Sequence, residues 1–258
     1  GSDISIAMVR GPRPPGATSD RLISVNRDGI HSKEVGKGAN IHDSLLEHIG
    51  DDMIASHGSF FTVTAIDAAA QTITIEHPQG FGSFGLAGEK LLVWNNKSMA
   101  QDATSTIVEV DPADNRRLRL DTVAGVDVGD FVSFPEHNGT GITIRRVTAR
   151  DGLSTAFNIR SPSATIEDVL IEHIWLPGIH MAVEAGPYYY EGPVPSGATL
   201  RRVTLRDTCI SSLCKGPFIQ MPGAVVAGIR RGTGLLSPNP YDDLHATHIL
   251  TSLRFEDL

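Results

Sequence analysis

Two adjacent aspartates, Asp51 and Asp52, stand in the stretch "LLEHIGDDMIASHG", directly before an alternation of apolar and polar residues. A third aspartate, Asp28, precedes a similar alternation in "DGIHS". Carboxyl groups that lie within a few ångströms of one another repel, which favours the sharing of protons or the binding of a cation. If folding brings the three together, they could supply a general acid and a general base. Calcium is an alternative occupant, because it prefers hard oxygen ligands.

Simpler structural roles for these acids remain open. An aspartate before a glycine, as in Asp28-Gly29, often forms a turn. The pair Asp51-Asp52 could cap a turn by accepting hydrogen bonds from backbone N–H groups. Whether the acids meet depends on the elements around them.

Those elements repeat along the chain. Five segments share an alternation of apolar and polar residues: "ANIHDSLLEHIG" from Ala39, "ITIRRVTARDG" from Ile142, "ATIEDVLIEHIW" from Ala164, "ATLRRVTLRDT" from Ala198 and "HILTSLRFEDL" from His248. A period of two is typical of strands that bury one face.

A second family of short strands aligns as well, in "DGIHS", "DDMIAS", "AFNIRS" and "GIHMAV". Ile30 and Ile54 are 24 residues apart, and Phe157 and Ile179 are 22 residues apart. Rungs of this length predict an all-β fold, a right-handed parallel β-helix in which stacked rungs bury a common core. A leucine-rich repeat has similar periods but requires a fixed Leu and Asn pattern. An ordinary β-sandwich would not repeat such similar phrases.

Residues 59–137 interrupt the repeat and contain a duplication of their own. The stretch "TVTAIDAAAQTITIEHP" followed by "GEKLLVWN" resembles "TIVEVDPADNRRLRLD" followed by "GDFVSFPE", and Asp67 and Asp111 suit hairpin turns. We predict a small antiparallel β-barrel here, inserted between two parts of the β-helix at 1–58 and 138–258. Loop excursions are expected at 187–197 and, in a Gly- and Pro-rich stretch, at 210–243.

Stacking of the rungs predicts where the candidate residues lie. If Ile30 and Ile54 point inward, Asp28 and Asp52 fall on neighbouring rungs, about 4.8 Å apart. Candidates for substrate contacts follow on the outward face of the second strand family, around the small residue Ala55: Asp28, His31, Lys33, His57, Asn158 and His180. Taken alone, His180 is more simply explained as a solvated surface residue.

The excursion "AGPYYYEGP" places three tyrosines beside Glu191. The flat faces of Tyr189 and Tyr190 could pack against a sugar ring while their hydroxyl groups form hydrogen bonds. Glu191 could then be the acid or the base of a glycosidic cleavage. The alternative is that this loop only covers the core of the β-helix.

Composition limits the partners. The net charge of −8 argues against nucleic acid, because phosphate binding requires clustered Lys and Arg. No apolar run approaches the roughly 20 residues that span a membrane. We expect a carbohydrate partner and no cofactor.

The order of these motifs resembles that of a known family. "DGIHSK", "GDDMIASHG", a barrel insert ending in "GDFVSFPE", further rungs and then "YEGP" are similar to the family-110 glycoside hydrolases. These are exo-acting bacterial α-1,3-galactosidases, some of which remove the terminal galactose of the blood group B antigen. The resemblance implies an inverting mechanism without metal, with acids of the GDD turn and a later glutamate in the site. Those acids correspond to Asp51, Asp52 and Glu191.

We therefore expect a secreted or periplasmic bacterial glycoside hydrolase, with Glu191 as the acid and Asp51 or Asp52 as the base. A polysaccharide lyase is the second hypothesis, and it would need a cation, or Lys33 or Arg160, to stabilise an enolate. A non-catalytic carbohydrate-binding β-helix is the third. In each case the open ends of the β-helix require cover, from a second copy of the chain or from further chain segments.

Overall fold

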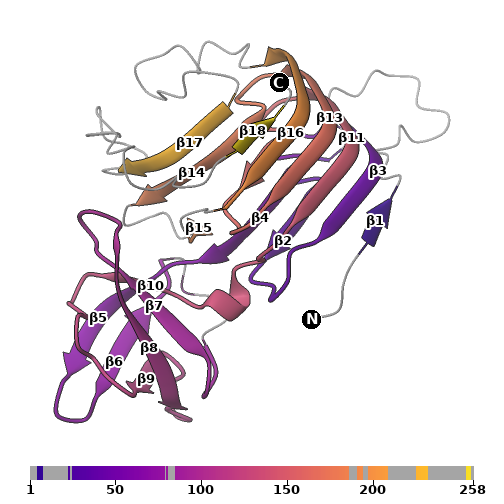
Figure 1. The fold of residues 1–258 in the computed structure, drawn as a ribbon. Coiled ribbons are helices and arrows are strands. Elements are labelled where there is room, and N and C mark those ends of the chain that lie inside the picture. The colour runs from indigo at the N-terminus through magenta and orange to yellow at the C-terminus, as the bar shows by residue number, and fades with distance from the viewer. Residues whose placement is uncertain are drawn as a thin grey trace.

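The computed structural model describes residues 5–7, 23, 25–78, 80, 85–185, 191–193, 197–208, 225–231 and 254–256. Figure 1 shows two parts, a stack of parallel strands and a small barrel that the chain enters after β4. Every described element except one 3-10 helix is a β-strand, so the predicted all-β architecture of stacked parallel strands plus an antiparallel barrel is confirmed. No helix in this described part is long and apolar enough to cross a membrane.

The first parallel sheet contains the five repeated segments and one further strand. In spatial order its strands are β1 (Ser5–Ala7), β3 (Asn40–Glu47), β11 (Thr143–Gly152), β13 (Thr165–Ile174), β16 (Thr199–Thr208) and β18 (Arg254–Glu256). Ile144 pairs with Ile41 on one side and with Ile166 on the other, and Ile166 pairs with Leu200. All four side chains are fully buried. The alternation therefore places one aliphatic residue per rung in the same inward column, and each contributes about 1.5–3 kcal/mol by its burial.

The second parallel sheet carries the other strand family. Its strands are β2 (Ile30–Lys33), β4 (Ile54–Ser59), β12 (Phe157–Ile159), β14 (Ile179–Ala185) and β17 (Val225–Arg231). Ile30 pairs with Ile54, Ile54 with Phe157, and Phe157 with Ile179, as the spacings predict. The inward side chains of both sheets form one hydrophobic core, which includes Met53 and Met181.

One strand of this sheet lies where the sequence predicted a loop. β17 falls within the excursion expected at 210–243, and it pairs in parallel with β14 from Ile179 opposite Val225 onward. The loop prediction is wrong for these residues, because "VVAGIRR" continues the register of the rungs while the Gly and Pro around it suggest a loop. The remainder of that predicted excursion lies outside the described residues.

The barrel has its own core. Its strands are β5 (Phe61–Asp67), β6 (Thr72–Glu76), β7 (Lys90–Trp94), β8 (Gln101–Val110), β9 (Arg117–Leu120) and β10 (Phe131–Ser133), closed in the order β10-β5-β6-β9-β8-β7. The predicted turns form, because the Asp67 and Asp111 carboxylates accept backbone hydrogen bonds from Ala70 and Ala113. A 3-10 helix, η1 (Pro135–His137), then leads the chain back to β11.

The outer face of the first sheet carries a ladder of alternating charge. Asp43, Arg146, Asp168 and Arg202 occupy equivalent positions of β3, β11, β13 and β16, each with a positive φ between 47° and 54°. The Arg146 guanidinium donates to both carboxylate oxygens of Asp43, at 2.5 and 2.7 Å, and Arg202 pairs with Asp168 in the same way. The Arg146 hydrogen bonds hold the pKa of Asp43 well below its usual range. This charge ladder therefore joins neighbouring rungs in pairs.

Candidate active site

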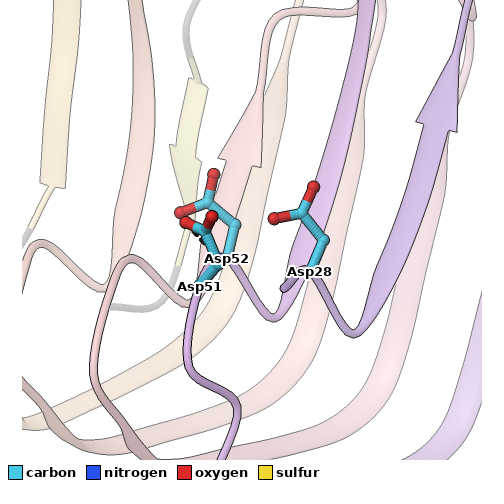
Figure 2. Close-up of side chains that lie close together, drawn as sticks. All are labelled: Asp28, Asp51 and Asp52. Atoms are coloured by element: carbon cyan, nitrogen blue, oxygen red, sulfur yellow. Dashed lines mark hydrogen bonds between the residues drawn. The ribbon is translucent and has the colours of Figure 1, made fainter. Parts of the chain in front are cut away.

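The three aspartates meet in the turns that precede β2 and β4, as Figure 2 shows. One carboxylate oxygen from each of Asp28, Asp51 and Asp52 lies within 4.8 Å of the other two. The Gly29 N–H donates to the Asp52 carbonyl at 2.9 Å, which fixes the two turns side by side. A side chain at Gly29 would meet the Met53 carbonyl at 2.7 Å, so glycine permits this close approach. The predicted stacking of Asp28 on Asp52 is confirmed.

Asp51 and Asp52 differ in their surroundings although they are adjacent in sequence. Asp52 is buried, and its two carboxylate oxygens accept hydrogen bonds from Ser154 at 3.0 Å and Asn158 at 2.5 Å. Loss of hydration raises the pKa of Asp52 to about 6; the charges of Asp51 and Asp28 add to the rise, and the hydrogen bonds from Asn158 and Ser154 oppose it. Asp51 is half-buried and accepts the Asp52 N–H at 3.1 Å. Asp52 is therefore the carboxyl group that can hold a proton near neutral pH.

A chain of hydrogen bonds leads from Asp28 through two histidines. His31 Nδ1 lies 2.9 Å from Asp28 Oδ2, and His31 Nε2 lies 2.9 Å from His57 Nε2. The remaining ring nitrogen of His57 lies 2.6 Å from the Gly58 carbonyl, so it carries the proton and donates it. Burial lowers the pKa of His57 to about 3, which keeps this ring neutral. His57 therefore accepts a hydrogen bond from His31.

A buried arginine holds Glu191 at the opposite end of β4. Glu191 and Gly192 form β15, which pairs antiparallel with Ser59 and Gly58. The Arg160 guanidinium pairs with the Glu191 carboxylate, and His57 Nε2 lies 3.9 Å from that carboxylate. An opposite charge this close favours the ionised form of the glutamate.

Gly192 allows β15 to lie close to Phe60, the residue that joins β4 to the first strand of the barrel. A side chain at Gly192 would meet the ring of Phe60 at 2.6 Å. The excursion expected at 187–197 therefore contains a short strand on β4, and this contact delivers Glu191 to the site.

The contacts close into a ring around Ala55. Asn158 Oδ1 lies 3.3 Å from His180 Nδ1, which lies 3.4 Å from Arg160 Nη2. Ala55 pairs with His31 on one side and with Asn158 on the other. We call the following residues the polar ring: Asp28, His31, His57, Glu191, Arg160, His180, Asn158 and Asp52. The interpretation of His180 as a solvated residue is wrong, because it is buried and hydrogen-bonded within this ring.

Other predicted residues lie beside the ring or outside the described chain. Lys33 pairs with His57 in the sheet, and its ammonium lies 3.4 Å from the Glu34 carboxylate. Tyr189 and Tyr190 lie outside the described residues. Sequence reasoning missed Arg160 as the partner of Glu191, although it follows Asn158 by two residues and therefore shares its face of the strand.

The three aspartates offer the all-oxygen donors that calcium prefers. However, both oxygens of Asp52 already accept hydrogen bonds from side chains, and Asp28 Oδ2 is paired with His31. Each carboxylate oxygen has two lone pairs, so these contacts do not exclude a cation. Calcium stays the alternative occupant, and its effect on the melting temperature decides between the two.

Together, fold and site define an all-β protein whose stacked parallel strands carry a ring of titratable side chains on an outward face. No protein-family model matches the chain, and no curated protein matches it. The resemblance to the family-110 glycoside hydrolases stays a prediction.

Proposed function

We propose that the protein is a glycoside hydrolase that removes a terminal α-galactoside-like sugar with inversion, on a right-handed β-helix. The observation that carries the proposal is the contrast between two carboxyl groups of the polar ring. Asp52 is buried among acids and has a pKa raised to about 6, whereas Glu191 is paired with the guanidinium of Arg160. Two titratable groups with opposed environments are the pattern of an acid and a base.

The electrostatics favours the reverse of the roles that the sequence suggested. Asp52 retains its proton near pH 6 and is the general acid. The Arg160 guanidinium favours the ionised form of Glu191, which we assign as the general base. Asp51 raises the pKa of Asp52 through its charge, so it acts on the acid and not on the substrate.

Inversion is proposed from the family resemblance, and it requires a particular separation of the two carboxyl groups. Asp52 is held by Asn158, and Glu191 is held by Arg160. Asn158 and Arg160 are two residues apart in sequence, which puts their Cα atoms about 6.6 Å apart but does not fix the separation of the two carboxyl groups. Inverting enzymes separate their carboxyl groups by about 6.5–9.5 Å, and retaining enzymes by about 5–5.5 Å.

The proposed reaction is a single displacement, with the sugar bound above Ala55. The carboxylic acid of Asp52 protonates the glycosidic oxygen as its bond to the anomeric carbon breaks. A water molecule attacks that carbon from the opposite side, and the Glu191 carboxylate accepts its proton. We place the sugar ring over Ala55, the smallest side chain within the polar ring; Ala55 is 3% exposed, so binding requires the surrounding side chains to move apart.

A polysaccharide lyase finds less support. Such an enzyme needs a cationic side chain for the uronate carboxylate and the enolate. Arg160 is paired with Glu191, and Lys33 is paired with Glu34, so both candidates already neutralise carboxylates of the protein.

The secreted or periplasmic location is proposed together with the hydrolase function.

The test is hydrolysis of an α-1,3-linked galactosyl disaccharide and of an aryl α-galactoside, with NMR observation of the anomer released first. The expected first product is β-galactose. Asp52→Asn should lose about 10²–10⁴-fold on the disaccharide and much less on the aryl substrate, whose leaving group needs little protonation. Glu191→Gln should lose activity on both substrates, and the exposed Asp168→Asn should lose none. Retention of configuration, or no hydrolysis of any galactoside, would overturn the proposal.

A further inference from the structure

Exposed apolar side chains of the β-helix part gather on one row of turns. Within the described residues, the large apolar side chains with the greatest exposure are Ile23, Val25, Leu86, Val108, Val128 and Trp175. Leu86, Val108 and Val128 belong to the barrel region. The other three lie on the turns between the first and second parallel sheets, where Val25 bridges to Ile49. The same row of turns holds Asp28, Asp51 and Asp52.

Trp175 is fixed relative to the acids by backbone hydrogen bonds. Its backbone N–H donates to the Gly152 carbonyl at 3.0 Å, and that of the next residue, Leu176, donates to the Ser154 carbonyl at 3.4 Å. The Ser154 hydroxyl in turn donates to Asp52. Two rungs separate Trp175 from the turn of the acids, which is about 10 Å. Trp175 and Asp52, the proposed proton donor, therefore lie on the same row of turns, two rungs apart.

The second tryptophan of the chain shows how this protein buries an indole. Trp94 is 9% exposed, and its Nε1–H donates to the Ser133 hydroxyl at 2.9 Å. Trp175, in contrast, is 49% exposed. Trp175 therefore presents a large aromatic surface to solvent on the same row of turns as the acids. Aromatic faces pack well against the C–H faces of sugar rings, and the indole N–H can donate to a hydroxyl.

The direction of the proposed reaction selects which sugar meets Trp175. Glu191 approaches the ring at the end of β4 that continues into the barrel, whereas Asp52 lies in the turn before β4. The general acid protonates the leaving oxygen, so the leaving group departs on the side of Asp52. That side is the row of turns that carries Trp175.

Resting on the proposed hydrolase function, we propose that Trp175 is the platform on which the sugar unit of the leaving group stacks. Ile23 and Val25 lie on the opposite side of the acid turn, three rungs from Trp175, and are not part of this surface. The preferred substrate is then a di- or oligosaccharide with a terminal galactoside-like unit, and not a glycoside with a small leaving group.

The two tryptophans make a direct binding test available. The indole N–H signals are recorded by NMR on Asp52→Asn, which slows turnover about 10²–10⁴-fold, during titration with an α-1,3-linked galactosyl disaccharide. The disaccharide should shift the Trp175 signal and leave the Trp94 signal in place. Free galactose, which occupies only the space over Ala55, should shift neither.

The second experiment measures kcat/KM of a single substitution at Trp175. Trp175→Ala should lower kcat/KM for the disaccharide about tenfold, the scale of one aromatic contact. It should leave kcat/KM for methyl α-galactoside unchanged, because methanol has no ring to stack. Val108→Ala, which truncates an apolar side chain of the barrel that is 43% exposed, is the matched control and should change neither value.

The outcomes separate this inference from the proposed function. If galactosides are hydrolysed and Trp175→Ala leaves the disaccharide unaffected, the platform is refuted and the hydrolase stands. If no galactoside is hydrolysed but the disaccharide shifts the Trp175 signal, the binding surface stands and the hydrolase fails. A Trp175 signal that moves with protein concentration in the absence of sugar would make this surface a contact between two copies of the chain, and would refute the platform.

Discussion

Replacement of Asp52 by asparagine should change the pH dependence of stability. The pKa of Asp52 is raised from 3.8 to about 6 in the folded protein, so the native state binds the proton more tightly than the unfolded state. Stability therefore falls as pH rises from about 4 to 6, where the unfolded chain has released a proton that the native chain still holds. A shift of about 2 units at 1.36 kcal/mol per unit gives a loss of about 3 kcal/mol. The asparagine of this variant cannot ionise, and its amide can still pair with Asn158 and Ser154.

The assay is chemical unfolding of the wild type and of Asp52→Asn between about pH 4 and pH 8. The unfolding free energy of Asp52→Asn minus that of the wild type should increase by about 3 kcal/mol from about pH 4 to pH 8. For a chain of this size this corresponds to roughly 6–12 °C in melting temperature. Asp51→Asn is the control: removing its charge lowers the pKa of Asp52, so its stability should fall less over this range than that of the wild type. Curves for wild type and Asp52→Asn that run parallel at all pH values would refute the electrostatic account of the site.

Three further outcomes are expected. The value of kcat/KM should fall above about pH 6 as Asp52 ionises, and Asp51→Asn should move this fall to lower pH; a limb that stays in place would exclude Asp52 as the acid. Glu191→Gln should cost about 3 kcal/mol in chemical unfolding, because it leaves the charge of Arg160 buried without its partner, and a second change, Arg160→Met, should recover part of that loss. Neither EDTA nor added calcium should change the melting temperature of the wild type; a rise of several degrees with calcium would show that the aspartates bind an ion.

The fold was predictable where the pattern is periodic. Period-two alternation and the spacing from Ile30 to Ile54 predict which residues stack, and this register alone brings Asp28 beside Asp52. The barrel was predictable because its two halves repeat the same order of strand and turn. β17 was not predictable, because the Gly and Pro residues near it are typical of a loop. Its strand structure depends on pairing with β14.

The site was predictable in part. Asp51 and Asp52 are equivalent in sequence, and only the path of the turn determines that Asp52 is the buried one. The pairing of Arg160 with Glu191 depends on an antiparallel contact between β15 and β4, which belongs to no repeat. No periodic pattern links these residues, so their partnership required the three-dimensional structure.

The charge ladder on the outer face of the first sheet restricts how a β-helix of this kind can be lengthened during evolution. Asp43, Arg146, Asp168 and Arg202 alternate in sign from rung to rung. Duplication of one rung would place two like charges at adjacent positions, which is destabilising. Duplication of two consecutive rungs preserves the alternation. The alternation therefore favours growth by pairs of rungs, and we expect homologues of different length to differ by even numbers of rungs in this region.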